Sequence, residues 1–536
     1  MKKILLFLVL LPLWVFAKHV PVDKAQNVAI NGFKELAEVK NPGVELYQTE
    51  QYHGNDVFYI FNLTKGKGFI IVSADDRIIP ILGYSTVNDF GEYPVPDGLK
   101  DFLETYKLQI ADVIENNLSG MEQAPSQWKH YSVPTEKFKP HKNDRFYLLG
   151  NINWDQGCGW NAYCPEDPNG DCGHVWTGCI ATAAGMIMKY WGYPPHGRGQ
   201  HSYQEDDYGT LSANFDTTYY WDNMQDNSAT DPAALLLYHF GVAVEMDYSP
   251  NGSGALFGDE LNALKTYFGY NPDLSFKAKS WFPNEEDWIN MLKEQLDAGY
   301  PLPYKGSSNS SGGHAFVCDG YNSSNQFHFN WGWSGWYNGY YSINNLNPGG
   351  ENFTENQAAG FDVHPEAPAP EHIHADINPD NTVLLTWTRP NALKEPSYYK
   401  IAKDGNWLDQ TITDTFFVDN DPLDPGMHTY EVKAVYSGFY LFDGEIESEP
   451  TATSFIITNV KKLDKDFRIT PNPASTYISI QSNRKDFTVE ISDLNGKIYG
   501  TYHNPQTINI KSLPEGIYFI KITTDNQEIC QKIIKL

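Results

Sequence analysis

The chain has 536 residues, a formal net charge of −28, and a hydrophobic share of 41 % that includes 14 % aromatic residues. Single hydrophobic cores stop growing at roughly 250 to 300 residues, and the apolar content is too high for a disordered chain, so we expect several folded domains. The acidic excess argues against nucleic acids and membrane surfaces as partners, because phosphate-binding surfaces need clustered Lys and Arg.

The first residues have the pattern of a secretory signal. Lys2 and Lys3 precede an apolar run that ends in Val15-Phe16-Ala17, a small-residue cleavage pattern, so residues 1–17 are predicted to be a signal peptide. No later stretch approaches the roughly 18 apolar residues that a membrane-spanning helix needs. We therefore expect a secreted protein without a transmembrane segment in its mature form.

Residues 18–142 alternate short apolar runs with polar turns and include GFIIVSADDRIIPILGYS at 68–85. The Lys- and Pro-rich stretch at 129–143 is predicted to be an exposed linker. A different composition follows, because residues 143–364 are rich in Trp, Tyr and Gly and contain nearly all the candidate chemistry.

The segment VWTGCIATAAGMIMKYWGYP at 175–194 predicts a buried helix with a cap at its start, and Gly192 and Pro194 mark its end. A cysteine in the first turn, such as Cys179, feels the positive end of the helix dipole and free amide groups, which favour the thiolate and lower the pKa. An isolated cysteine is more often a core residue or half of a disulfide. A nucleophile therefore needs a base elsewhere in the chain.

A candidate base is His314, in SSGGHAFVCDGYNSSNQFHFNWGWSG at 310–335. The apolar runs on either side of Asn322–Asn325 predict a two-stranded hairpin. Gly312 and Gly313 remove side chains just before the histidine, so a substrate backbone could approach the imidazole. Acyl transfer also needs oxyanion donors, and the Cys179 backbone N–H together with Gln156, in NWDQGCGWNAYCP at 153–165, would supply them.

The six cysteines are unevenly spread. Cys158, Cys164 and Cys172 lie close together, so one local disulfide is expected, although the sequence does not fix the pair. His174 beside Cys172 could suggest zinc, but nearby cysteines in a secreted chain more often form disulfides. The string at 167–171 resembles a calcium loop but lacks the following glycine and the bidentate glutamate. We predict no metal and no cofactor.

The C-terminal third contains two further units. PEAPAPEH at 365–372 is a spacer, and the strands TVLLTWT at 382–388, YYKIAKD at 398–404 and HTYEVKAVYSG at 428–438 predict a β-sandwich over 365–460. This sandwich resembles a fibronectin type III module. Residues 461–536 alternate as strands again but carry more basic than acidic residues.

The pattern of residues 461–536 resembles a known sorting signal. FRITPNPAS at 467–475, ISDLNGKIY at 491–499, LPEGIYFIKI at 513–522 and the KIIKL terminus are similar to the C-terminal sorting domain of type IX secretion substrates. The resemblance implies passage through the outer membrane, with the type IX secretion machinery as a partner. The strand pattern alone would equally predict a small β-sandwich with a binding function.

Four motifs together resemble the streptopain family, family C10, of papain-like cysteine proteases: NWDQG, TGCIATAAGMIMKYW, GGHAFVCDGY and NWGWSG. The resemblance covers about 145–350. It implies an α+β fold in which a helical side carrying the cysteine faces a β-rich side carrying the histidine. It also implies an endopeptidase acting on proteins or peptides, with Cys179 as nucleophile, His314 as base and acid, and Gln156 as oxyanion donor.

The same resemblance extends to residues 18–142. GFIIVSADDRIIPILGYS is similar to the inhibitory prodomain of these proteases, which is itself α+β, so this region would block the cleft until the linker is cut near 137–145. A tethered plug acts at a high effective concentration.

The resemblance leaves two candidates for the residue that orients His314, Asn330 and Trp331. Papain-like enzymes in general use an asparagine for this role, whereas streptopain-like enzymes use a tryptophan. Pairing Tyr321 with Gln326 places His314 and Trp331 on one face of the hairpin, although a bulge would reverse this. MDYSPNGSGA at 246–255 resembles a substrate-pocket loop, so Ser253 and Gly313 are candidate substrate contacts.

Two other functions fit the same residues. The chain could be a catalytically silent adhesion protein that binds ligands through the β-sandwich, or a secreted amidase that acts on cell-wall peptides. Labelling of Cys179 by an epoxide inhibitor separates the first from a protease, and a comparison of peptidoglycan with protein substrates separates the second.

Overall fold

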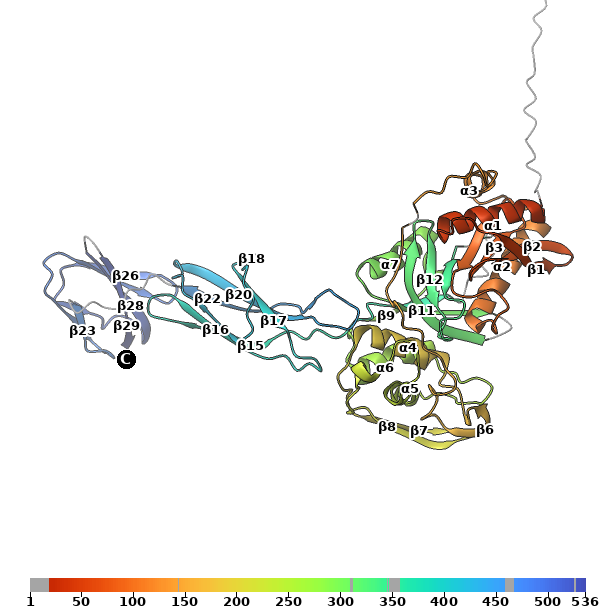
Figure 1. The fold of residues 1–536 in the computed structure, drawn as a ribbon. Helices are drawn as coiled ribbons and strands as arrows, with labels where there is room; N and C mark the ends of the chain where they lie inside the picture. Colours follow the sequence, from red (N-terminus) through yellow and green to blue (C-terminus); the bar gives the residue numbers. More distant parts are fainter. Residues whose placement is uncertain are drawn as a thin grey trace, which may run out of the picture. The chain divides into compact units, whose positions relative to one another are not determined.

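The computed structural model describes residues 19–142, 144–308, 312–344, 346, 357–457, 467–524 and 527–536 (Figure 1). The signal segment predicted at 1–17 lies outside these ranges. The chain divides into two compact units. The first runs to Pro370 and also contains Arg389–Tyr399 and Lys433–Glu449, and the second contains Glu371–Thr388, Lys400–Val432 and Pro450–Leu536. No helix of the described residues is both long and apolar enough to cross a bilayer.

The N-terminal domain is an antiparallel sheet with helices around it. Its elements are α1 (Val22–Leu36), β1 (Val44–Tyr52), β2 (Asn55–Leu63), β3 (Phe69–Ser73), β4 (Ile81–Ser85), α2 (Asp97–Glu115) and α3 (Ala124–Tyr131). β3 and β4 are buried at every position, which explains the continuous apolar runs in this part of the sequence. The linker predicted at 129–143 is corrected at its start, because α3 continues to Tyr131; residues 132–142 form turns and irregular structure.

After β5 (Arg145–Tyr147), which is a strand of the β-rich side, the helical side of the central region begins with β6 (Glu166–Asp171). It continues with α4 (Cys179–Trp191), β7 (Gln200–Glu205), β8 (Gly209–Asn214), the short 3-10 helix η1 (Trp221–Asn223), α5 (Asp231–Ala243) and α6 (Phe257–Phe268). The predicted helix 175–194 therefore exists, and it ends at Gly192 in the left-handed conformation, a common helix stop. Every residue of α4 after Cys179 is buried, so this helix is the centre of its own core.

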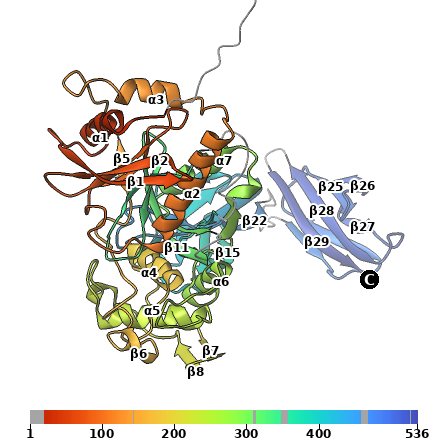
Figure 2. The ribbon, with the colours of Figure 1, turned by 90° about the vertical axis from the view of Figure 1, so that its right-hand side faces the viewer.

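The β-rich side follows in the chain. Its elements are β9 (Ser275–Ala278), the 3-10 helix η2 (Lys279–Trp281), α7 (Glu285–Asp297), β10 (Leu302–Ser308), β11 (Gly312–Asn322), β12 (Gln326–Asn330), β13 (Gly339–Ser342) and β14 (Ala358–Phe361). The predicted α+β class with a helical and a β-rich side is confirmed. Figure 2 shows α2 lying across the sheet, and α2 packs against β1, β2, β10 and β11.

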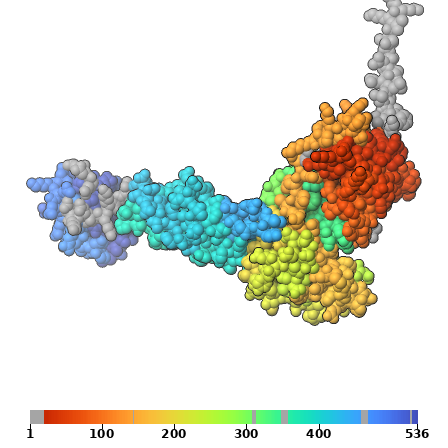
Figure 3. All heavy atoms as spheres, viewed as in Figure 1, coloured from red at the N-terminus to blue at the C-terminus, as the bar shows by residue number. Residues whose placement is uncertain are grey.

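One sheet of eleven strands joins the N-terminal domain to the β-rich side, in the order β1-β2-β3-β4-β13-β12-β11-β10-β14-β9 with β5 beside β11. The junction is the antiparallel pairing of β4 with β13, where Tyr84 faces Tyr340 and Gly83 faces Tyr341. The Tyr106 hydroxyl of α2 also donates to the Ser342 carbonyl at 2.6 Å. Figure 3 shows the red and orange atoms of the N-terminal domain lying directly against green atoms of the β-rich side. The two regions therefore share one core.

The C-terminal part contains only strands among its described residues. The predicted strands at 382–388, 398–404 and 428–438 correspond to β16 (Val383–Thr388), β17 (Tyr398–Lys403) and β20 (Gly426–Tyr436). The elements are β15 (Glu371–Ile377), β16 (Val383–Thr388), β17 (Tyr398–Lys403), β18 (Asn406–Trp407), β19 (Phe416–Asp419), β20 (Gly426–Tyr436), β21 (Ile446–Glu447) and β22 (Thr451–Ile457). The tail has its own apolar core and consists of β23 (Phe467–Thr470), β24 (Tyr477–Ser482), β25 (Thr488–Asp493), β26 (Ile498–His503), β27 (Thr507–Asn509), β28 (Gly516–Thr524) and β29 (Gln527–Lys535).

Candidate active site

Cys179 is the first residue of α4, and a glycine precedes it for a steric reason. Gly178 has φ 87°, and a Cβ atom built on it would lie 2.6 Å from the Met246 sulfur, so a larger residue does not fit. The side-chain cap expected before Cys179 is wrong. Thr177 does not cap the helix, since its hydroxyl lies 3.0 Å from that of Thr182. The free amides at the helix start remain directed towards the cysteine.

His314 comes from the neighbouring strand β11 and is half-buried. β11 packs against α4, and the backbone N–H of Ala315 donates to the Cys179 sulfur at 3.4 Å. Cys179 and His314 line one cavity of about 730 Å³. The structure thus brings the predicted nucleophile and the predicted base together.

Most of the other predicted residues line the same cavity. They are Gln156, Ser253, Gly313 and Trp331. Asn330 is the exception. Its amide donates to the Ile152 carbonyl at 2.7 Å, and its oxygen accepts from the Gly332 amide at 3.2 Å, so it fixes the backbone beside the Gln156 loop.

Trp331 is buried against the cavity wall. Its indole N–H donates to the Tyr337 carbonyl at 3.0 Å, and its ring lies 4.7 Å from the Phe316 ring. Trp331 and Phe316 belong to the core shared with the N-terminal domain, whereas Ala315 and Val317 belong to the core around α4. This alternation follows from the strand, whose successive side chains point to opposite faces.

The register of the hairpin differs from the predicted one at its turn. Tyr321 faces Phe327, not Gln326, and the register then shifts between Cys318 and Gly320. This bulge restores the expected pairing nearer the site, where Val317 faces Asn330. A residue count from the turn assumes regular pairing and therefore misses a bulge.

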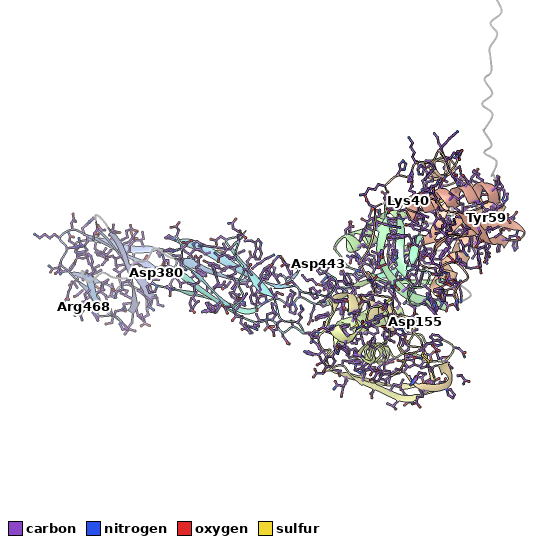
Figure 4. The ribbon with its side chains drawn as sticks, viewed as in Figure 1. Lys40, Tyr59, Asp155, Asp380, Asp443 and Arg468 are labelled. Carbon is purple, nitrogen blue, oxygen red and sulfur yellow. A yellow bond between two sulfur atoms is a disulfide. The ribbon has the colours of Figure 1, made fainter. Side chains whose placement is uncertain are left out.

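The Gln156 loop is held by residues that sequence reasoning missed. Asp155 accepts from the Gln156 amide at 2.7 Å and from the Ser334 hydroxyl at 2.6 Å, which ties this loop to the turn after β12. Figure 4 labels Asp155 on the helical side. Gln156 itself is 7 % exposed, unlike an ordinary surface glutamine. Asp155 could have been identified from the sequence, because it directly precedes Gln156 in the NWDQG motif.

The local disulfide joins Cys158 to Cys172, while Cys164 is a buried free thiol. The Cys158 amide also donates to the Asp171 carboxylate at 2.7 Å. His174 contacts the Cys164 carbonyl through Nδ1 at 2.7 Å. Two of the sulfurs considered for zinc are therefore consumed by the disulfide.

The opposite wall of the cavity is the loop that precedes α6. Asp247 and Gly254 exchange two backbone hydrogen bonds, at 2.9 and 3.0 Å, which close the loop between them. The Ser253 hydroxyl accepts from the Ser249 amide at 3.1 Å, so its oxygen also shapes the loop. Leu256 and Phe257 add apolar surface at the start of the helix.

The N-terminal domain reaches into this cavity. Asp97 and Gly98, the first two residues of α2, line it together with Cys179 and His314. A Cβ atom on Gly98 would lie 2.9 Å from Phe316 Cδ1 and 3.0 Å from Trp331 Cε3, so the helix approaches as closely as a glycine allows.

The electrostatics of the thiol differ from the expectation. Burial raises the pKa of Cys179, and this effect outweighs the Ala315 amide and the helix-start amides, which lower it. Sequence reasoning predicted a lowered pKa because it considered only the helix start. A negative charge on Glu260 raises the thiol pKa further. Glu260 is fully buried in α6, and neither of its carboxyl oxygens has a hydrogen-bond partner in the part of the chain that the structure describes. Burial raises the pKa of Glu260 well above 4.5.

Comparisons with known proteins agree with this geometry. Residues 154–341 match the peptidase C10 family, residues 17–110 match the Spi protease inhibitor family, and residues 468–536 match the secretion system C-terminal sorting domain. Thiol protease/hemagglutinin PrtT of Porphyromonas gingivalis is 33 % identical over 303 residues, which cover 55 % of this chain and 34 % of that protein. This chain therefore spans about a third of PrtT.

Two further relatives resemble the same part of the chain. A prointerpain A fragment from Prevotella intermedia has 32 % identity and a TM-score of 0.48, covering 60 % of this chain and 100 % of the fragment. Streptopain of Streptococcus pyogenes is 30 % identical over 337 residues, which cover 58 % of this chain and 79 % of streptopain. The extent of this last match and the family match around Cys179 and His314 show that the chain belongs to the peptidase C10 family of cysteine proteases.

Proposed function

We propose that the chain is a secreted cysteine endopeptidase that is made as an inactive zymogen. The observation that carries the proposal is the meeting of Cys179 and His314 at one cavity, with the Ala315 amide 3.4 Å from the sulfur. Asp97 and Gly98 line the same cavity, so the N-terminal domain takes up space that a substrate would need. In this form the half-buried thiol is held protonated, because its pKa is raised by desolvation.

Catalysis begins once the N-terminal domain has left. Water then reaches the cavity, the desolvation of the thiol decreases, and His314 accepts the proton of Cys179. The thiolate attacks the peptide carbonyl carbon, and the imidazolium gives its proton to the leaving amine. Water activated by His314 then hydrolyses the thioester and regenerates the thiol.

The residues around the pair have distinct proposed roles. The Gln156 side chain and the Cys179 backbone N–H would hold the oxyanion, a contribution of a few kcal/mol to the barrier. Trp331 is the better candidate to position His314, since it lines the cavity and its ring is fixed by the bond to Tyr337. The Asn330 amide instead donates to the Ile152 carbonyl, so Asn330 would hold the backbone beside the Gln156 loop.

The cavity walls favour an apolar substrate side chain. Leu256, Phe257 and Trp333 line the cavity, so we propose that the residue just before the scissile one is hydrophobic. Ser253 and Gly313 would contact the substrate backbone from opposite walls.

The remaining segments fit export and activation. We propose a signal peptide at 1–17, an inhibitory prodomain at 18–142, a protease domain at 143–364, a fibronectin type III-like sandwich at 365–460, and a sorting domain at 461–536 read by the type IX secretion machinery. Cleavage near 137–145 would release the prodomain, which is the chain's own inhibitor.

The test combines a cysteine variant with covalent labelling. Cys179→Ala should abolish casein hydrolysis and self-processing, and an epoxide inhibitor of thiol proteases should label Cys179 in the processed wild-type protein. Cys530→Ala, which removes a half-buried thiol in the tail, should leave both unchanged. Undiminished hydrolysis by Cys179→Ala would refute the assignment.

A further inference from the structure

Three side chains that can bind metals converge in the N-terminal domain, away from the catalytic cavity. Glu35 at the end of α1, His130 in α3 and His141 in the segment after α3 each offer one ligand atom, and these three atoms lie within 4.8 Å of one another. The rings of His130 and His141 are stacked, with centroids 4.5 Å apart and an interplanar angle of 6°.

The carboxylate in this cluster is fixed before any ion binds. Glu35 is 7 % exposed, and its two oxygens accept hydrogen bonds from the Tyr131 hydroxyl and from the His141 backbone amide, each at 2.8 Å. Metal sites are usually supported in this way by outer groups that orient the ligands. His130 Nε2 lies 2.8 Å from Glu35 Oε2. Among the described residues, His130 is the basic side chain that contacts the Glu35 carboxylate.

The position of the cluster gives it a consequence for activation. Residues 132–142 lie between α3 and the protease domain, and side chains of α1 hold this linker: Asn31 donates to the Val133 carbonyl at 2.7 Å and Lys34 to the Thr135 carbonyl at 2.6 Å. His141 lies at the far end of the same segment, within the region where cleavage is proposed.

We propose that Glu35, His130 and His141 bind a Zn²⁺ ion in the zymogen, and that the ion fastens the linker to α1 and delays its cleavage. Two imidazole nitrogens and a carboxylate oxygen suit zinc, whereas Ca²⁺ and Mg²⁺ prefer oxygen ligands alone. Ligands of a tetrahedral zinc ion stand roughly 3.3 Å apart. His130 and Glu35 need to separate by only a few tenths of an ångström, and the exposed His141 side chain can turn towards them. Zinc binds His130 Nε2 in place of its hydrogen bond to Glu35, the imidazole then carries its N–H on Nδ1, and water fills the fourth position.

The delay of cleavage depends on the zymogen function proposed above, but the site itself can be tested without activity. Full-length Cys179→Ala protein, free of affinity tags, is titrated with Zn²⁺ by calorimetry and with Co²⁺ by visible absorption. We expect one tight ion per chain, with the absorption of tetrahedral cobalt and without thiolate charge-transfer bands. Adding His141→Ala should weaken zinc binding roughly tenfold or more, because one ligand is lost. His53→Ala, which removes another exposed histidine of the same domain, is the matched control.

The second readout is trypsin cleavage after Lys142, next to His141. With free zinc at ten times its dissociation constant, cleavage should slow about tenfold if the linker must release the ion first. The His141→Ala variant should show no slowing. Absence of zinc and cobalt binding, binding that neither His141→Ala nor Glu35→Gln weakens, or binding without slower cleavage would each overturn the proposal. Because Cys179→Ala is used throughout, a failure here differs from a failure of the protease assignment.

Discussion

The amide nitrogen of Ala315 lies 3.4 Å from the sulfur of Cys179, so the strand that carries His314 contacts the nucleophile through its own backbone. Helix α4 and strand β11 pack directly against each other. Because Ala315 follows His314 in the chain, any shift of the strand along the helix changes the distance between imidazole and sulfur. The geometry of the pair is therefore set by the packing of a buried helix against a sheet.

His314→Ala should lower kcat/KM of the processed enzyme by roughly 10² to 10⁴-fold, the usual contribution of a general acid–base group. The control is His196→Ala, since His196 is half-exposed on the same domain and does not line the cavity. Hydrolysis of a fluorogenic peptide gives the rates. Wild-type activity in His314→Ala would assign the base to another residue.

Gly98→Ala should loosen the prodomain. The added methyl would lie 2.9 and 3.0 Å from the Phe316 and Trp331 rings, and such overpacking costs about 1 to 3 kcal/mol, or roughly 5- to 150-fold in prodomain affinity. Iodoacetamide should then alkylate Cys179 of the unprocessed protein faster, and maturation should begin earlier. Glu115→Gln changes an exposed position at the far end of the same helix and serves as the control. Equal alkylation rates in the two variants would mean that α2 does not seal the cavity.

Much of this architecture follows from local patterns in the sequence. The uncharged run before Lys189 and the stop at Gly192 define α4, and the alternation in residues 382–388 defines a strand. Three features could be recognised only in the folded structure. The bulge near Cys318 escapes a count that assumes regular pairing, the pKa of Cys179 depends on the desolvation of its thiol in the folded chain, and the meeting of Glu35 with His130 joins distant parts of the chain.

The double variant Cys158→Ala/Cys172→Ala, which lacks the disulfide, should destabilise the segment that follows Gln156. The bond closes a loop with a sequence separation of 14, for which chain entropy predicts about 3 kcal/mol. We expect a lower midpoint of thermal unfolding in the Cys179→Ala background. In the active enzyme kcat should fall more than KM rises, because Gln156 lies just before the loop and is proposed to hold the oxyanion of the transition state. Cys530→Ala should change neither quantity, and a double variant as stable as this control would contradict the prediction.

Glu260→Gln should change the pH dependence of stability. The native pKa of Glu260 is raised by burial well above the unfolded value near 4.5, so between these two values the folded protein binds a proton that the unfolded chain has lost. Wild-type stability should therefore fall, relative to the variant, as pH rises from about 4.5 towards the native pKa, with a slope of up to about 1.4 kcal/mol per pH unit.

Urea unfolding at several pH values in the Cys179→Ala background gives this difference, and Glu294→Gln, at an exposed position of α7, is the control. A second readout is the thiol. Since a charge on Glu260 raises the pKa of Cys179, the alkylation profile of an otherwise wild-type Glu260→Gln protein should shift to lower pH. Identical pH profiles for Glu260→Gln and Glu294→Gln would mean that the Glu260 carboxyl group gains a partner in solution, because an unpaired buried acid cannot titrate like a surface one.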